Sequence, residues 1–216
     1  MYYNGEMAEW LNAPVLKTGI LKGIWGSNPC FSANNKNMGD GFFVMRLPLY
    51  ANGLKEMIGW MNQFEPTSKM KMIEIGSYIG ESTMIFADYF KEVVSVDPFL
   101  DGYDMDDPAC HCWPFSMVYN QFLINTLPHS NIKSIRLKSD EAVEVVRHQQ
   151  WDFVYIDGLH TYDGVMKDIE NYKHLVKPGG FIGGHDYIDD FGVKKAVDEN
   201  FTISKSFSDT SWIVKL

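Results

Sequence analysis

The fold is decided by the stretch Met72-Ile73-Glu74-Ile75-Gly76-Ser77-Tyr78-Ile79-Gly80. Its first four residues form an apolar strand that contains one acid, and Gly76 then allows the backbone to turn sharply and to be approached closely. A strand that runs into a glycine turn typically opens a βαβ unit, whose ligand binds outside the carboxyl ends of the strands. The stretch therefore predicts a parallel sheet with a cofactor at that edge.

The spacing of the glycines narrows the choice of cofactor. Pyrophosphate-binding turns have the pattern Gly-x-Gly-x-x-Gly, whereas Gly76 and Gly80 here are separated by three residues, and Tyr78 stands where a second glycine would be. Because a bulky side chain there crowds a pyrophosphate, the turn favours a cofactor other than a dinucleotide. A nucleotide-binding oxidoreductase is the alternative, and a purely structural role of both glycines is another.

Strand and helix patterns alternate along the rest of the chain. Apolar residues with helical spacing (Leu54, Met57, Ile58 and Met61) predict a helix that starts at residue 52 and is ended by Pro66. Strands are predicted at 71–75, 92–96, 132–137, 151–156, 181–184, 201–205 and 211–215, and further helices at 81–90, 115–127, 140–148, 165–172 and 193–199. A turn at 177–180 is expected to lead into the fifth strand.

This alternation predicts an α/β fold, namely a Rossmann-like, seven-stranded, mostly parallel sheet with an antiparallel last strand and helices on both faces. We expect residues 52–216 to form the cofactor-binding domain and residues 1–51 to form a cap at the N-terminal end. Residues 1–50 mix Gly, Asn and aromatic residues without a regular period. Either a lid on the substrate side or an irregular surface layer is consistent with that composition.

A second acid follows the first at a suitable distance for a ribose. Asp97 ends the second predicted strand, 21 residues after Gly76, where a carboxylate can accept hydrogen bonds from ribose hydroxyls. Pro98 and Phe99 then offer an apolar surface for an adenine. Ser139 and Asp140, after the third predicted strand, can hydrogen-bond the adenine edge. The alternative is that Asp97 is only a turn or cap residue.

Acids and imidazoles at the ends of the fourth and fifth predicted strands indicate the site of chemistry. Asp157 ends one strand, and His185 and Asp186 end the other, so these side chains meet if the strands are neighbours. We predict a divalent-metal site there, with Mg²⁺ or Mn²⁺ as the ion. His160 lies on the loop over the same edge, and it is the candidate general base, with Asp157 as its catalytic partner. Structural roles, such as helix capping by Asp186, are the alternatives.

Other polar residues are interpreted more simply. Cys110-His111-Cys112 lacks the ligand spacing of a zinc site, and we expect a loop over the active site. The acids of the loop after the second strand are expected to be solvated charges rather than a calcium loop; they are Asp101, Asp104, Asp106 and Asp107. Asp168 is expected to be a solvated helix acid, and Tyr162 a packing residue.

Composition excludes several classes of protein. The chain has 216 residues, a formal net charge of −9 and 45% hydrophobic residues, which disfavours both disorder and unaided binding to nucleic acid. Three cysteines are too few for a disulfide framework. No signal-peptide pattern is present at residues 1–10, and no apolar stretch approaches a membrane span. We therefore expect a cytoplasmic protein without membrane contact, and a homo-oligomer stays open.

On these motifs the chain resembles the class I S-adenosylmethionine-dependent methyltransferases over residues 52–216. Within that class it is similar to small-molecule and sugar O-methyltransferases that have the motif Ile-Asp-Gly-x-His-x-Tyr, which is present here at residues 156–162. The resemblance implies S-adenosylmethionine as the cofactor and a small-molecule acceptor whose oxygen is methylated. A catalytically silent cofactor-binding module on the same fold is a further alternative.

The resemblance also implies roles for individual residues. The methionine part of the cofactor would be held by the turn and the start of the next helix, through Glu74, Gly76, Ser77, Tyr78, Gly80 and Ser82. Asp97 would hold the ribose, Ser139 and Asp140 would border the adenine, and Asp157 would contact the cofactor as well as the acceptor. His185 departs from the pattern, since metal-binding relatives usually have an acid at its position.

Overall fold

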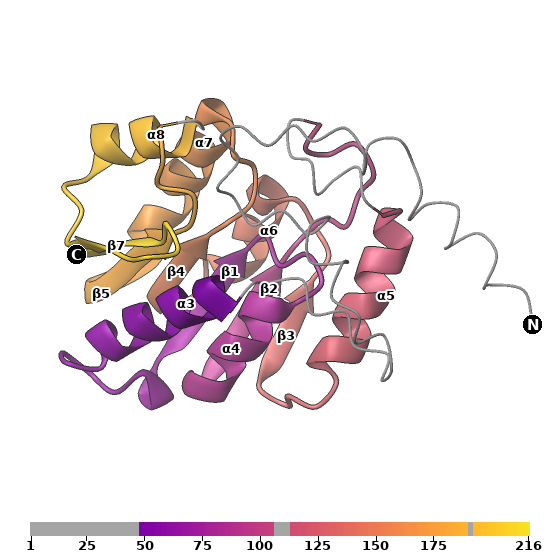
Figure 1. Cartoon of the computed structure of the whole chain (residues 1–216), viewed down its shortest axis with the longest axis horizontal. Coiled ribbons are helices and arrows are strands. Elements are labelled where there is room, and N and C mark those ends of the chain that lie inside the picture. Colours follow the sequence, from indigo (N-terminus) through magenta and orange to yellow (C-terminus); the bar gives the residue numbers. More distant parts are fainter. Residues whose placement is uncertain (1–47, 106–112, 190–191) are drawn as a thin grey trace, which may run out of the picture.

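A seven-stranded sheet with helices on both faces forms the computed structural model, which describes residues 48–105, 113–189 and 192–216 (Figure 1). The strands are β1 (Lys71–Ile75), β2 (Glu92–Val96), β3 (Ile132–Ile135), β4 (Trp151–Ile156), β5 (Val176–Gly184), β6 (Lys205–Ser206) and β7 (Trp212–Lys215). The helices are α3 (Pro48–Met61), α4 (Glu81–Tyr89), α5 (Phe115–Thr126), α6 (Ser139–Val146), α7 (Tyr162–Tyr172) and α8 (Gly192–Asn200), with short 3₁₀ turns at Thr67–Lys69 and Lys173–Leu175.

The strand order is β3-β2-β1-β4-β5-β7-β6, with β7 antiparallel to both of its neighbours and the other pairs parallel. This confirms the predicted fold class. The chain moves outward from β1 to β3 and then returns to place β4 on the other side of β1. The direction of winding therefore changes between β1 and β4, which is where ligands bind in open α/β sheets.

Alternating residues of the central strands pack into two apolar layers, one on each face of the sheet. Ile73, Ile75 and Val154 belong to a core cluster with α6, α7 and α8. Met72 and Phe153, their neighbours in sequence, belong to a second cluster with α3 and α4. Successive side chains of a strand point to opposite faces, so nearly continuous apolar strands such as β1 are buried on both sides (Figure 1).

The predicted element boundaries hold best in the central strands. β1, β2 and β4 begin and end at the predicted residues. α3 begins at Pro48, four residues before the predicted start, and so within the segment assigned to the cap. The remainder of that predicted cap, residues 1–47, lies outside the described residues. No helix in the described part of the chain is long and apolar enough to cross a membrane.

Two local predictions near the C-terminal hairpin are wrong. The expected turn at 177–180 lies inside β5, where Gly179 has a φ of +80° and the register against β4 shifts. Proline and glycine occur inside strands at such irregularities. The expected strand at 201–205 is reduced to β6, because Phe201 and Ile203 pack against the core cluster under α8 instead of pairing in the sheet.

Gly76 brings the ends of β1 and β4 into direct contact. Its φ is +84°, and a Cβ atom at this position would lie 1.9 Å from the carbonyl oxygen of Asp157. The backbone N–H of Asp157 donates to the carbonyl of Ile75 at 2.7 Å, and the N–H of Gly76 donates to the carbonyl of Val96 at 2.9 Å. The glycine turn is therefore required for the approach of two strand-end loops.

We predict that Gly76→Ala lowers the free energy of unfolding by about 2–4 kcal/mol, since the new methyl group meets backbone atoms at a positive φ. The matched control is Gly59→Ala, at an exposed helical position with no atom within 4 Å of the new Cβ. That change is expected to raise stability by about 0.5–1 kcal/mol. Urea unfolding followed by tryptophan fluorescence measures both, and a wild-type midpoint for Gly76→Ala would contradict the prediction.

Candidate active site at the carboxyl edge of the sheet

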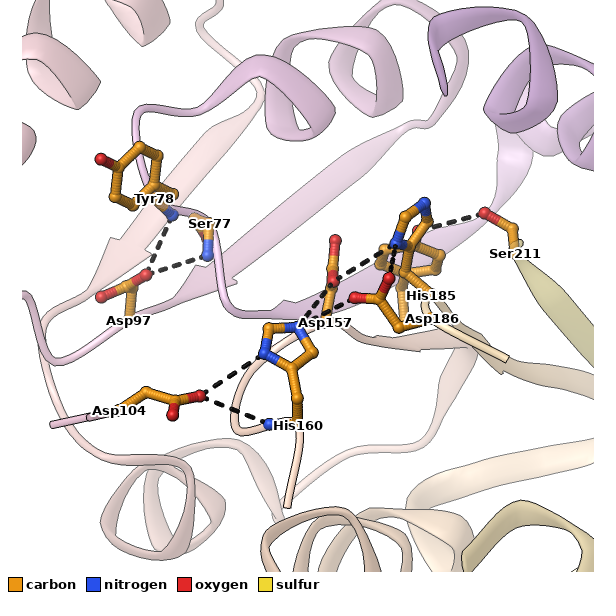
Figure 2. A network of polar contacts seen from close by, with 10 residues as sticks. Ser77, Tyr78, Asp97, Asp104, Asp157, His160, His185, Asp186 and Ser211 are labelled. Carbon is orange, nitrogen blue, oxygen red and sulfur yellow. Dashed lines mark hydrogen bonds and ion pairs between the residues drawn. The ribbon is translucent and has the colours of Figure 1, made fainter. Parts of the chain in front are cut away.

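The predicted site residues gather at the carboxyl ends of four adjacent strands. Ile75 of β1 pairs with Val96 of β2 on one side and with Ile156 of β4 on the other, and Ile156 pairs with Gly184 of β5. Asp97, Asp157 and His185, each the next residue after its strand, therefore follow one another along this edge (Figure 2). The cofactor and acceptor candidates occupy two halves of one edge.

Asp97 ties the glycine turn to the end of β2. Its Oδ2 accepts the backbone N–H groups of Ser77 and Tyr78 at 3.0 and 2.9 Å, and its Oδ1 accepts that of Phe99 at 2.7 Å (Figure 2). Burial raises the pKa of this carboxyl, while the backbone hydrogen bonds oppose the rise. A carboxylate offers about four acceptor sites, so Oδ1 keeps capacity for one more donor, which fits a ribose hydroxyl.

Glu74 lies beneath the turn in the core. Its side chain is fully buried, and Oε2 accepts the hydroxyl of Ser77 at 3.1 Å and also that of Thr83. Burial raises the pKa of Glu74 to about 7. Ser82, another predicted cofactor residue, is buried beside it at the start of α4. Both residues hold the turn from below, and Gly80, with a φ of +84°, precedes α4 as its N-cap.

Non-glycine residues at this edge have unusual backbone conformations. Tyr78, Phe99 and Asp186 have φ values of +46°, +49° and +56°, a region that side chains other than glycine seldom adopt. The N–H of Tyr187 donates to the carbonyl of Thr210 at 3.0 Å, which links the Asp186 turn to the C-terminal hairpin. Such strained positions concentrate at functional sites, and no sequence pattern indicated them.

Asp157, His160 and Asp186 form the centre of the acceptor half. His160 Nε2 lies 3.0 Å from Asp186 Oδ2 and 3.7 Å from Asp157 Oδ1. One ligand atom from each of the three residues lies within 4.8 Å of the others, an arrangement that could hold a metal ion. Figure 2 shows the imidazole of His160 between these two carboxylates and Asp104.

The carboxylates set the charge of the imidazole. Burial opposes protonation, but Asp104, Asp157 and Asp186 outweigh it and raise the pKa of His160 well above its usual value. Burial likewise opposes ionisation of Asp186, but His185 and His160 hold the pKa of its carboxyl well below its ordinary value. The three carboxylates therefore favour the protonated imidazole, whose charge would neutralise part of the acidic cluster.

His185 is buried beside the two acids of this cluster. The predicted metal set was Asp157, His185 and Asp186, and the group of the described residues that could hold an ion contains Asp157 and Asp186 together with His160. The side chain of His185 is completely buried, with Nδ1 3.2 Å from Asp186 Oδ1 and 4.0 Å from Asp157 Oδ1. Figure 2 shows it next to Asp186, on the side away from His160 and toward Ser211.

Two acids that were expected to be solvated are buried. Asp104, only 7% exposed, contacts His160, and Asp168 on α7 is only 3% exposed. Burial raises the pKa of Asp168 to about 7. A signal for Asp168 was present, because it shares the helical face of Val165, Ile169 and Tyr172. Nothing local distinguishes Asp104 from its neighbour Asp101, which caps α5 by accepting the N–H of Phe115 at 2.9 Å.

The remaining predicted positions have clear structural contacts. Ser139 is buried at the start of α6, where its carbonyl accepts the hydroxyl of Tyr172 at 2.7 Å, and Asp140 pairs with Lys167 at 2.5 Å. The hydroxyl of Tyr162 donates to Glu199 at 2.5 Å. Pro98 and Phe99 follow Asp97, and Phe99 packs on Phe122. Asp106, Asp107 and the segment Cys110-His111-Cys112 lie outside the described residues.

Comparison with known proteins agrees with the fold and identifies a family. A family model described as a methyltransferase domain matches residues 73–187, more than half of the chain. This match includes the glycine turn, Asp97, and the cluster of Asp157, His160 and Asp186. No curated protein matches the sequence at a significant level.

Solved structures are similar in fold at low sequence identity. A Staphylococcus aureus protein provisionally assigned as a caffeoyl-CoA O-methyltransferase aligns with a TM-score of 0.52 and 19% identity, over 76% of this chain and 82% of that one. An rRNA methylase from Streptococcus thermophilus aligns with a TM-score of 0.51 and 14% identity, over 80% and 99%. The chain spans 26% of a Haemonchus contortus phosphoethanolamine N-methyltransferase solved with S-adenosylhomocysteine (TM-score 0.45, 15% identity, 65% of this chain).

The buried Glu74 predicts a pH dependence of stability. Its carboxyl ionises near 4.5 in the unfolded chain but keeps its proton to about pH 7 in the folded protein. Its stabilising contribution is complete below 4.5 and is lost as the pH rises through 7, because the unfolded state then releases the proton first. Glu74→Gln should therefore reduce the fall in unfolding free energy between about pH 5 and 8, measured by urea unfolding.

Glu92→Gln is the control, because the hydrogen bond with Lys133 lowers the pKa of Glu92, so that Glu92 is ionised in both states over this range. It should leave the slope unchanged. Identical slopes for the wild type and Glu74→Gln would show that burial does not hold a proton on Glu74.

Proposed function

The chain belongs to the methyltransferase-domain family and is an S-adenosylmethionine-dependent methyltransferase, and on that premise we propose that it methylates an oxygen atom of a small molecule or sugar. The observation that carries the proposal is the cluster of Asp157, His160 and Asp186, whose ligand atoms lie within 4.8 Å of one another. It lies on the same edge as the glycine turn, one strand away. A proton-accepting or cation-binding group is thus adjacent to the cofactor candidates, as O-methylation requires.

The contacts of the turn support the proposed cofactor half. S-adenosylmethionine, when bound, supplies an electrophilic methyl group on sulfur. Asp97 would orient the ribose through the remaining capacity of its Oδ1, and Phe99 would support the adenine. Glu74 and Ser82 are buried against the turn, where they would support the shape that contacts the methionine part of the cofactor. The family match decides against the nucleotide-binding oxidoreductase.

The acceptor half requires that His160 lose a proton. An imidazolium can neither accept the proton of an acceptor hydroxyl nor bind a cation, so the raised pKa of His160 describes a resting state. Once Nε2 is free of its proton it faces Asp157 and Asp186, and these three residues would hold a divalent cation. Carboxylates with one imidazole favour Mn²⁺ or Mg²⁺. Such an ion would lower the pKa of an acceptor hydroxyl.

A small-molecule acceptor fits the charge of the protein. The chain has a net charge of −9, and tight binding to a phosphate backbone needs clustered Lys and Arg. The acidic cluster at the acceptor half would repel an anionic polymer further. A hydroxylated small molecule, by contrast, can reach a cation held by Asp157 and Asp186 without bringing many negative charges to the same edge.

We expect S-adenosylhomocysteine to raise the melting temperature, by an amount that corresponds to about 2.7 kcal/mol at 100 times its Kd. Mn²⁺ should add a further shift. Asp157→Asn and Asp186→Asn should lose the Mn²⁺ shift and methyl transfer to hydroxylated acceptors, followed by mass spectrometry. The control Asp189→Asn changes an exposed acid that pairs with Lys194 and should behave as wild type.

Each negative result in that series has a distinct meaning. A protein that does not respond to S-adenosylhomocysteine would contradict the cofactor assignment. A response to the cofactor without transfer to any acceptor would identify a catalytically silent module. Transfer that is indifferent to Mn²⁺, Mg²⁺ and chelators would remove the metal from the proposal while leaving His160 as the base.

A second prediction concerns pH. Because the proton on His160 competes with a cation for Nε2, the affinity for Mn²⁺ should increase as pH rises toward the elevated pKa of His160. Calorimetric titration in two buffers of different ionisation enthalpy should show that protons are released on binding. Affinity that is constant with pH and binding without proton release would contradict the assignment of His160 as a ligand.

A further inference from the structure

We propose that Asp104 is a positioning residue of the active site, which holds His160 by its Nδ1 side so that Nε2 faces Asp157 and Asp186. The inference rests on the proposed function, in which Nε2 is the working atom. Asp104 comes from the loop after β2, whereas His160 comes from the loop after β4. The site therefore depends on a contact between two loops 56 residues apart in the sequence.

The geometry of the contact fixes the ring in two ways. Oδ2 of Asp104 lies 3.4 Å from the backbone N of His160, which donates to it, and 3.4 Å from Nδ1 of the ring. One carboxylate oxygen thus contacts both the main chain and the side chain of the same residue. Figure 2 shows the result, with Asp104 on one side of the imidazole and Asp157 and Asp186 on the other.

The division of the two ring nitrogens has a chemical consequence. In a neutral imidazole one nitrogen carries a proton and the other is a lone-pair acceptor. Carboxylates lie beside both nitrogens, with Asp186 3.0 Å from Nε2 and Asp104 3.4 Å from Nδ1. When Nε2 gives up its proton to a cation, Asp104 keeps the remaining proton on Nδ1, which leaves the lone pair on Nε2. Histidines that bind metals commonly donate their other N–H to an acid in this manner. The same orientation serves a general base, so the inference does not depend on which role His160 has.

Asp104 is buried, so its carboxylate needs a partner within the protein. Its exposed fraction is 7%, and that of the His160 side chain is 16%. Ionised groups that are removed from water need a partner, and the imidazole supplies one. The two other acids in the described part of this loop have other partners, since Asp97 accepts the N–H groups of the glycine turn and Asp101 accepts the N–H of Phe115 in α5. Asp104 is the acid of the described loop that reaches His160.

The test compares Asp104→Asn with Asp101→Asn in the full chain. The two substitutions remove one charge each from the same loop, but Asp101 makes its contact with α5. We expect Asp104→Asn to weaken Mn²⁺ binding, measured by calorimetry, by about 10–100-fold. It should lower kcat by a similar factor with little change in KM for S-adenosylmethionine. Asp101→Asn should match the wild type in both.

A spectroscopic readout separates this inference from the proposed function. The Nδ1–H proton of His160 should give a downfield resonance that is protected from exchange. It is assigned to His160 by its loss in His160→Gln, and to Nδ1 and not Nε2 by its coupling to the ring nitrogens in ¹⁵N-labelled protein. It should be present in the wild type and in Asp101→Asn, and absent or rapidly exchanging in Asp104→Asn. This measurement needs neither metal nor acceptor, so it tests the positioning role even if the wild type shows no methyl transfer.

Two outcomes would overturn the positioning role. One is an Asp104→Asn protein that keeps the protected resonance and binds Mn²⁺ as Asp101→Asn does. The other concerns Asp104→Glu, a variant that keeps the charge but moves the carboxylate. This variant also provides the test if Asp104→Asn does not fold. Partial recovery of Mn²⁺ affinity and of the resonance is expected there, and full wild-type behaviour would show that only the charge matters.

Discussion

The contact between Gly76 and the backbone of Asp157 is the constraint on which the rest of the site depends. The two loops that leave β1 and β4 touch through main-chain atoms, because a side chain at Gly76 would occupy the place of the Asp157 carbonyl. The contact sets the distance between the cofactor half and the acceptor half by main-chain packing and hydrogen bonding and not by flexible side chains. Active sites need their groups held within a fraction of an ångström, and here two adjacent strands provide that precision.

Several acidic side chains are buried around this contact, and they are accommodated in three different ways. Glu74 and Asp168 respond with raised pKa values, Asp97 accepts three backbone N–H groups, and Asp104, Asp157 and Asp186 share His160. Each of these arrangements lowers the cost of burying acids in one part of the edge. Of these groups, Asp157, His160 and Asp186 have ligand atoms close enough together to hold a cation, which is why we propose them as the site of chemistry.

The architecture and the strand-end positions of the candidate site could be predicted from the sequence, and the physical reasons can be named. Asp97 and Asp157 directly follow mostly apolar runs that identify strands without any tertiary information. Their position at the carboxyl edge of the sheet could therefore be predicted before any contact was known. The pairing of Asp104 with His160 is a tertiary contact across two loops, and no local period encodes it. The place of His185 relative to Asp186 could not be predicted for a related reason, because adjacent residues of a turning chain point in different directions, and the turn geometry, with Asp186 at a φ of +56°, is not a local sequence signal. The burial of Asp168 could have been predicted, since its helical spacing places it on the apolar face of α7.

The link between the Asp186 turn and the C-terminal hairpin has a consequence for the order in which the protein assembles. The cofactor half is drawn from β1, β2 and the loop between β1 and α4, which are close together in the sequence. The acceptor half needs β5, and the turn after β5 is tied to Thr210, next to β7, a strand that must insert between β5 and β6. Chains fold from the N-terminal side as they are synthesised, and pairings between distant segments form slowly. A nascent chain would therefore shape the glycine turn well before the turn after β5 is held in place, so the cluster of Asp157, His160 and Asp186 forms only in molecules that have completed the sheet.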